Sequence, residues 1–142
     1  MRSARSLCFV ILSSAMLLLV AEVALAAGEE ARDVDTTGLK KLGSEVLKVN
    51  PYDPIDKRAV EIGAAAFNEN CARCHGLGAV SGGIAPDLRF LPEGEEGDEV
   101  FSQRVQNGST RDGRVLMPPF KDALSQETLW AIRTWLITVR EE

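Results

Sequence analysis

The two cysteines and the single histidine that could do chemistry together lie within five residues, Cys71-Ala72-Arg73-Cys74-His75. On a helix, positions i, i+3 and i+4 share one face, so both sulfur atoms and the imidazole ring can point the same way. The sulfur atoms can then form thioether bonds to the two vinyl groups of a haem while a ring nitrogen binds its iron. The C-x-x-C-H spacing therefore predicts covalent attachment of one haem c.

A C-x-x-C pair alone has other uses, because such pairs also form disulfides, redox-active dithiols and halves of zinc sites. A structural zinc site needs four ligands, and the chain has neither a second such pair nor a second histidine. The alternating strands and helices that surround a thioredoxin-like dithiol are missing as well. The alternatives remain open at this point, but a histidine directly after the second cysteine favours haem.

A haem bound through His75 has a second axial position, which Met117 is the best candidate to fill. Another histidine does not exist, and Met117 is the only methionine after residue 26. Its thioether is a soft ligand, and ligation by histidine and methionine raises the reduction potential. The prolines at 118 and 119 restrict the backbone beside it. Core packing of this methionine, or an open sixth position, is the alternative.

A histidine that binds iron also needs a partner for its other ring nitrogen. Pro86, 11 residues after His75, offers a backbone carbonyl and has no amide hydrogen of its own. Four arginines are candidates to neutralise the haem propionates: Arg89, Arg104, Arg111 and Arg114. Iron with both axial positions filled has no vacancy for oxygen, peroxide or substrate, so we expect an electron-transfer protein rather than an enzyme.

The N-terminus has the features of a signal peptide. Arg2 and Arg5 precede the apolar run Leu7–Val20, and Ala24–Ala26 supplies small residues for the peptidase. The run has 14 residues, whereas a membrane span needs about 20. The pattern predicts a cleaved signal peptide of residues 1–26 and export to the periplasm, with an uncleaved anchor as the alternative.

The net charge limits the classes of possible binding partner. The 142 residues carry a net charge of −5, and removal of the signal peptide leaves 14 basic and 20 acidic side chains. This negative balance argues against nucleic acid and against an anionic membrane surface as partners.

The remaining 116 residues suffice for one small hydrophobic core, which is thin by itself. A largely apolar porphyrin would complete that core.

Hydrophobic periodicity places the elements that must position these residues. Residues 27–54 read as a polar leader, either a tether or a wrap over the surface. Apolar residues from 55 to 70 recur at intervals of three and four residues, which predicts a helix that ends at the C-x-x-C-H turn. Gly63 inside it costs about 1 kcal/mol relative to alanine, which suggests close approach of another helix. Residues 100–106 can form a short helix, and a final helix should run from a Ser125 cap to about Arg140.

The other segments read as loops. Residues 92–99 hold five carboxylates and are expected to form a solvated acidic loop, and residues 111–120 also look loop-like. No strand pattern appears, so the predicted fold class is all-α.

These features resemble the class I c-type cytochromes. Gly63 and Phe67 are similar to that family's N-terminal helix pair, and Ile132, Trp135 and Leu136 to the helix that crosses it. The resemblance implies a single-domain class I cytochrome c fold over residues 55–142, around one covalently attached haem. It implies that Cys71 and Cys74 form the thioether bonds and that His75 and Met117 are the axial ligands of the iron. It also implies that the Pro86 carbonyl accepts a hydrogen bond from His75.

Three stretches resemble a narrower group, the small periplasmic cytochromes that accept electrons from PQQ-dependent alcohol dehydrogenases. They are GGIAPDLR, VQNGSTRDGRVLMPPF and LSQETLWAIRTWL. The resemblance implies a monomeric one-electron carrier between a quinoprotein alcohol dehydrogenase and a terminal oxidase or second cytochrome. Alternatives are a haem-binding subunit of a membrane-bound dehydrogenase or oxidase complex, and a haem enzyme or gas sensor with an exchangeable sixth ligand.

Overall fold

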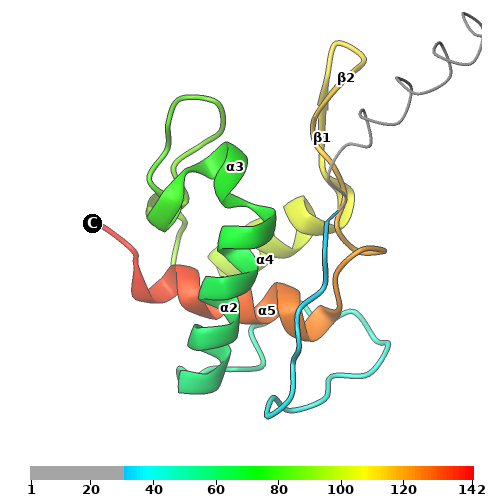
Figure 1. Ribbon diagram of the computed structural model, residues 1–142, viewed down its shortest axis with the longest axis vertical. Coiled ribbons are helices and arrows are strands. Elements are labelled where there is room, and N and C mark those ends of the chain that lie inside the picture. The colour runs from blue at the N-terminus through cyan, green and yellow to red at the C-terminus, as the bar shows by residue number, and fades with distance from the viewer. Residues whose placement is uncertain (1–30) are drawn as a thin grey trace, which may run out of the picture. The chain divides into compact units, whose positions relative to one another are not determined.

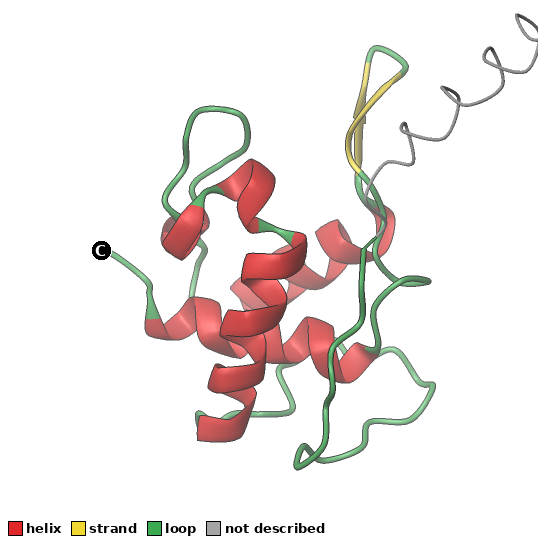
Figure 2. Cartoon of the chain, viewed as in Figure 1, coloured by secondary structure: helices red, strands yellow, loops and turns green. Residues whose placement is uncertain are grey.

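The computed structural model describes residues 31–142 (Figure 1). The predicted signal peptide and its cleavage site before Ala27 lie outside the described residues. None of the helices in the described part is long and apolar enough to cross a membrane. The elements, in chain order, are α2 (Lys57–Asn70), α3 (Ala72–His75), the 3-10 helices η1 (Leu77–Ala79) and η2 (Leu88–Phe90), α4 (Gly94–Asn107), β1 (Ser109–Arg111), β2 (Arg114–Met117) and α5 (Gln126–Thr138). Helices dominate (Figure 2), as the sequence predicted.

The crossing of α2 and α5 organises the fold. Helix α2 begins after Asp56, whose carboxylate accepts hydrogen bonds from two backbone amides of the first turn. At Gly63 an added Cβ would lie 2.0 Å from the carbonyl oxygen of Ala131, so only glycine lets α5 pass this close. The rings of Phe67 and Trp135 pack beside this crossing with centroids 4.6 Å apart. The predicted close approach of a second helix is confirmed.

Residues 31–54, which we call the strap, run over the helices instead of extending away from them. Leu39 and Tyr52 are buried in a cluster with Ile62 of α2 and Trp130 of α5. The strap also bonds the first turn of α5, where the Gln126 side chain accepts from one strap amide and donates to two strap carbonyls. The strap therefore contributes to the core that holds α2 and α5 together.

A buried polar cluster joins the strap to α4 and α5. The Arg133 Nε atom donates to Asp98 at 2.8 Å, and the side chains of these two residues are 1% and 4% exposed. The other Asp98 oxygen accepts from the Asn50 amide at 2.8 Å, and the Asn50 side chain bonds Thr134 at 3.1 Å. Every buried polar side-chain atom among the described residues has a partner, as burial requires.

This cluster corrects the prediction of a solvated acidic loop over residues 92–99. Helix α4 begins within that segment, with Glu95 and Glu96 in its first turn, where the helix dipole favours negative charge. Asp98 is buried because its charge is balanced by an arginine 35 residues away in the chain. A partner that distant is invisible to local pattern analysis.

Replacing Asn50 by alanine should loosen the strap. The substitution leaves one Asp98 oxygen with its amide donor but removes the side-chain bonds to Thr134 and to the Tyr52 amide. We expect a loss of about 1–2 kcal/mol in the free energy of unfolding, measured by urea denaturation. The matched control is Asn68→Ala, because Asn68 is exposed on α2. Equal losses in both variants would mean that the Asn50 side chain does not hold the strap.

A small β hairpin replaces the predicted loop between 111 and 117. Strand β1 pairs antiparallel with β2, with Thr110 opposite Val115. The turn residues Asp112 and Gly113 have φ values of 51° and 75°, the left-handed conformation of a two-residue Asp-Gly turn. The prediction of no strands was wrong here. The Asp-Gly signal for a hairpin turn was present in the sequence.

Candidate functional site

The two cysteines and the histidine occupy a single helical turn at the end of α2. Backbone amides of Cys74 and His75 donate to the Cys71 carbonyl at 3.1 and 3.0 Å, which closes the turn of α3. Cys71 is half-buried, Cys74 is exposed, and the two are not joined by a disulfide. Two thiols and an imidazole are thus presented within one turn, the arrangement needed to hold a porphyrin from one side.

The ring of His75 is buried and fixed by one hydrogen bond. Its Nδ1 atom lies 2.8 Å from the carbonyl oxygen of Pro86. A carbonyl can only accept, so Nδ1 carries the hydrogen and the lone pair resides on Nε2. This tautomer leaves Nε2 available as a metal ligand, with its orientation set by the carbonyl.

The Cys71 thiol is poorly suited to zinc or dithiol chemistry. Burial, with a smaller contribution from neighbouring Cys74, raises the pKa of the Cys71 thiol to about 12. Metal binding and disulfide exchange use the thiolate, and reactive cysteines have a lowered pKa. In residues 31–142 no group of three or more His, Cys, Asp and Glu side chains is arranged to hold a metal ion. Both observations count against the zinc and redox alternatives.

Met117 ends β2 and is half-buried against the same core that Cys71 contacts. Its backbone is held close to the end of α4, because an added Cβ at Gly108 would lie 2.4 Å from the Met117 carbonyl oxygen. Gly108 also has a φ of 68°, a conformation that favours glycine. The hairpin and this glycine contact together position the methionine.

The surroundings of the turn fit a large apolar group. The loop after α3 and the hairpin extend beyond the same end of the helices in Figure 1. Large apolar side chains in these two segments are exposed, among them Leu77 at 77% and Ile84 at 81%. Further ones are Val80, Phe90, Val115 and Leu116. Exposed apolar side chains on both segments fit a surface that a largely apolar group covers.

Two of the four arginines proposed for the propionates already have other partners. Arg89 is paired with Asp87 and Glu141, and Arg104 donates to the Gly108 carbonyl at 3.3 Å. Arg111 and Arg114 are exposed on the hairpin and keep the predicted role as candidates.

Sequence reasoning missed the residues that hold the loop around Pro86. The amide and hydroxyl of Ser81, the carboxylate of Asp87 and the guanidinium of Arg89 form one hydrogen-bonded network there. The Asp-x-Arg spacing is a local signal of such a pair, but the Ser81 and Glu141 contacts depend on how the loop folds.

The Asp87 carboxylate should make stability depend on pH in the acid range. Hydrogen bonds from the Arg89 side chain, followed by backbone amides, hold its pKa at about 2, below the value of about 3.9 in an unfolded chain. A lowered pKa stabilises the fold above pH 4 and this contribution disappears as the pH falls towards 2.

The measurement is urea unfolding of the holoprotein at pH 5 and pH 2.5. We expect Asp87→Asn to lose less stability than the wild type between these two values, since asparagine cannot titrate. Asp122→Asn is the matched control, because Asp122 is exposed on the surface. The same pH dependence in Asp87→Asn and the wild type would refute the role of this carboxylate.

Comparison with known proteins assigns the chain to a family. Residues 58–136 match the family model described as cytochrome C oxidase, cbb3-type, subunit III. The chain is 57% identical over 126 residues to cytochrome c550 of Pseudomonas aeruginosa, which covers 86% of this chain and 87% of that protein. No solved structure matches.

Longer proteins contain a similar region. Quinohemoprotein alcohol dehydrogenase ADH-IIG of Pseudomonas putida is 39% identical over 82 residues, which is 58% of this chain but 11% of that protein. The cbb3-type cytochrome c oxidase subunit FixP of Rhizobium meliloti is 30% identical over 125 residues, 84% of this chain and 43% of that protein. With the family model covering more than half of the chain and cytochrome c550 matching nearly all of it, the chain belongs to the cytochrome c family: it is a monohaem c-type cytochrome that carries covalently bound haem c and transfers electrons.

Proposed function

We propose that this cytochrome accepts electrons from a PQQ-dependent alcohol dehydrogenase and passes them to a terminal oxidase or a second cytochrome. The observation that carries the proposal is the 39% identity to part of a quinohemoprotein alcohol dehydrogenase. A second such dehydrogenase, ADH IIB of the same organism, is 33% identical over 79 residues. Both dehydrogenases therefore contain a segment similar to this chain, which supports a donor of this class.

The geometry of the turn supports the roles proposed for the two cysteines and the histidine, and the sequence supports the role proposed for Met117. Cys71 and Cys74 would form the thioethers, and His75 Nε2 would be the proximal ligand. Pro86 orients that ring through the bond to Nδ1, and Met117 would supply the distal sulfur. Haem iron bound in this way supplies a reversible one-electron change. With His75 and Met117 as ligands in both oxidation states, little reorganisation would accompany electron transfer.

We also propose export to the periplasm, with a mature N-terminus at Ala27. The basic and apolar pattern of the first 26 residues supports this proposal, and covalent haem suits an exported protein. Mass spectrometry of the purified holoprotein tests it: the mass of residues 27–142 plus one haem is expected, and a full-length mass would contradict it.

The partner assignment is tested by mixing the purified oxidised holoprotein with a quinoprotein alcohol dehydrogenase and ethanol. We expect rapid haem reduction, followed by visible absorbance, and no reduction when PQQ is omitted from the dehydrogenase. If charge guides docking, the rate should fall as salt rises, because screening weakens long-range attraction. A rate no faster than in the PQQ-free control would contradict this donor.

A second candidate is a haem-binding subunit of an oxidase complex. The match to FixP along 84% of the chain favours it. The two candidates differ in assembly, since a carrier is recovered as a free monomer whereas a subunit copurifies with membrane proteins. Size-exclusion chromatography of the exported, detergent-free fraction distinguishes them.

A further inference from the structure

The loop that carries Pro86 is held on both sides of that residue. On one side, the Ser81 hydroxyl donates to the Ala85 carbonyl at 2.5 Å. On the other side, the Asp87 carboxylate accepts from the Ser81 amide at 3.2 Å. Pro86 itself has a fixed φ, so pinning both neighbours also fixes the direction of its carbonyl group. That carbonyl is the one bonded to His75.

Arg89 holds the Asp87 side of this loop. Its Nε and Nη2 atoms donate to the two carboxylate oxygens of Asp87 at 3.1 and 2.9 Å, and its amide donates to the same carboxylate at 3.0 Å. The Arg89 and Asp87 side chains are only 18% and 20% exposed. A bidentate arginine–carboxylate pair that is partly shielded from water holds the orientation of its side chains better than an exposed pair.

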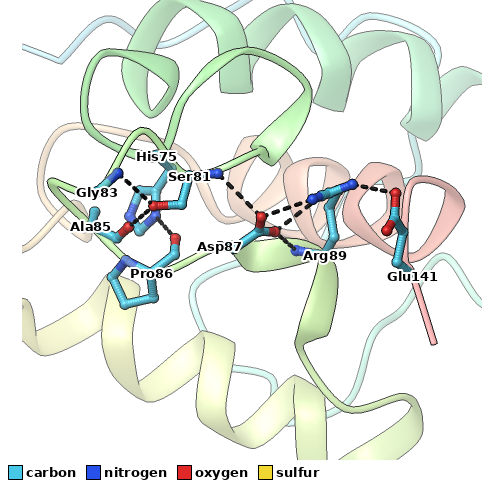
Figure 3. A network of polar contacts seen from close by, with 8 residues as sticks. All are labelled: His75, Ser81, Gly83, Ala85, Pro86, Asp87, Arg89 and Glu141. Carbon is cyan, nitrogen blue, oxygen red and sulfur yellow. Dashed lines mark hydrogen bonds and ion pairs between the residues drawn. The ribbon is translucent and has the colours of Figure 1, made fainter.

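The same arginine is bound by the C-terminal end of the chain (Figure 3). A third guanidinium nitrogen, Nη1, donates to the Glu141 carboxylate, and the Glu141 amide donates to the Arg89 carbonyl at 3.0 Å. The contacts thus run without interruption from Glu141 through Arg89, Asp87 and the Ser81 loop to the carbonyl beside His75. Residues 66 positions apart in the chain are connected in this way.

We propose that Arg89 is a positioning residue for electron transfer: held by Glu141, it keeps the Pro86 carbonyl against His75 and thereby lowers the reduction potential of the bound haem. The inference rests on His75 as the proximal ligand. A firm Nδ1–H···O bond makes the imidazole a stronger donor, and hydrogen bonds around axial ligands tune haem potentials. A stronger donor favours the oxidised state, so weakening this bond raises the potential.

The direction of the shift separates this role from a simple charge effect. Removing a positive charge near haem disfavours the reduced state and lowers the potential. If loss of Arg89 instead weakens the hydrogen bond between His75 and Pro86, the reduction potential rises. The expected signs are therefore opposite, and a variant that only removes a positive charge elsewhere in the chain provides the comparison.

The experiment measures reduction potentials of purified holoprotein variants by redox titration. Arg89→Lys comes first, because it keeps the charge but loses the two-pronged geometry; Arg89→Gln follows. The control is Arg140→Gln, since the Arg140 guanidinium pairs with Glu93 at 3.1 Å, outside the residues that hold the Pro86 loop. Glu141→Gln is compared with Glu142→Gln, which removes the same charge from a side chain that is exposed at the chain end.

We expect Arg89→Lys and Arg89→Gln to shift the oxidised-to-reduced equilibrium threefold to tenfold towards the reduced state, where tenfold is about 59 mV for one electron. Glu141→Gln should raise the reduction potential more than Glu142→Gln does. Arg140→Gln should lower the potential. Exchange of the His75 Nδ1 hydrogen, followed by NMR, should be faster in both Arg89 variants than in Arg140→Gln.

An unchanged potential in Arg89→Lys together with a fall in Arg89→Gln equal to that in Arg140→Gln would overturn the proposal. So would an unaltered exchange rate of the Nδ1 hydrogen. Failure of the proposed ligation would appear differently, as an abnormal haem spectrum already in the wild type. Failure of the proposed donor would leave all these potentials as expected.

Discussion

Replacing Met117 by alanine or leucine should lower the reduction potential and open the haem to added ligands. The thioether stabilises the reduced state, and axial ligands set haem potentials over a range of roughly 0.8 V. We expect a fall on the order of 0.1 V, measured by redox titration. Carbon monoxide and cyanide should then bind quickly and completely, whereas the wild type should bind them only as fast as its own sulfur ligand dissociates.

The two substitutions separate ligation from packing. Met117 is half-buried against the core, so alanine also removes contacts, whereas leucine keeps most of the volume. Both should lose the ferric absorption that arises from sulfur coordination. Thr110→Ala is the control on the paired strand β1, because Thr110 is exposed, and it should keep a potential close to that of the wild type. Unchanged potential and ligand binding in Met117→Leu would remove this residue as the axial ligand.

Features of the site that depend on neighbours in the chain were predictable from the sequence. The spacing of Cys71, Cys74 and His75 requires only one helical turn, which α3 provides. The Ser125 cap of α5 also depends on local residues, and its hydroxyl does accept from the Thr128 amide. The Asp112-Gly113 turn belongs to the same class: its signal was local, and the hairpin could have been predicted from it.

Apart from the helix crossing that Gly63 indicated, features that depend on distant partners were not predicted. The Asp98 carboxylate resembles its solvated neighbours in sequence, and only Arg133 on another helix explains its burial. The leader could have been a tether or a wrap, and its course is fixed by partners on α5 about 80 residues away, such as Gln126. Arg89 looked suitable for a propionate, but Glu141 and Asp87 occupy its guanidinium. Residue type identified the chemistry in each case, and the fold determined the partner.

Gly63→Ala should strongly destabilise the fold. The new Cβ would lie 2.0 Å from the Ala131 carbonyl oxygen and 2.4 Å from its carbon. These are backbone atoms of α5, so no side-chain rotation relieves the clash and the two helices must separate. Separation would loosen the ring contact between Phe67 and Trp135. We expect a loss of about 3 kcal/mol or more in the free energy of unfolding.

Urea denaturation of the holoprotein measures this loss, with Gly82→Ala as the matched control. Gly82 has nothing within 4 Å of an added Cβ, so the same chemical change there should alter stability by less than about 0.5 kcal/mol. The helix-propensity term alone would make alanine better than glycine by about 1 kcal/mol inside α2. A Gly63→Ala protein that is as stable as the wild type, or more stable, would therefore mean that propensity outweighs the contact and that the helices do not cross at this distance.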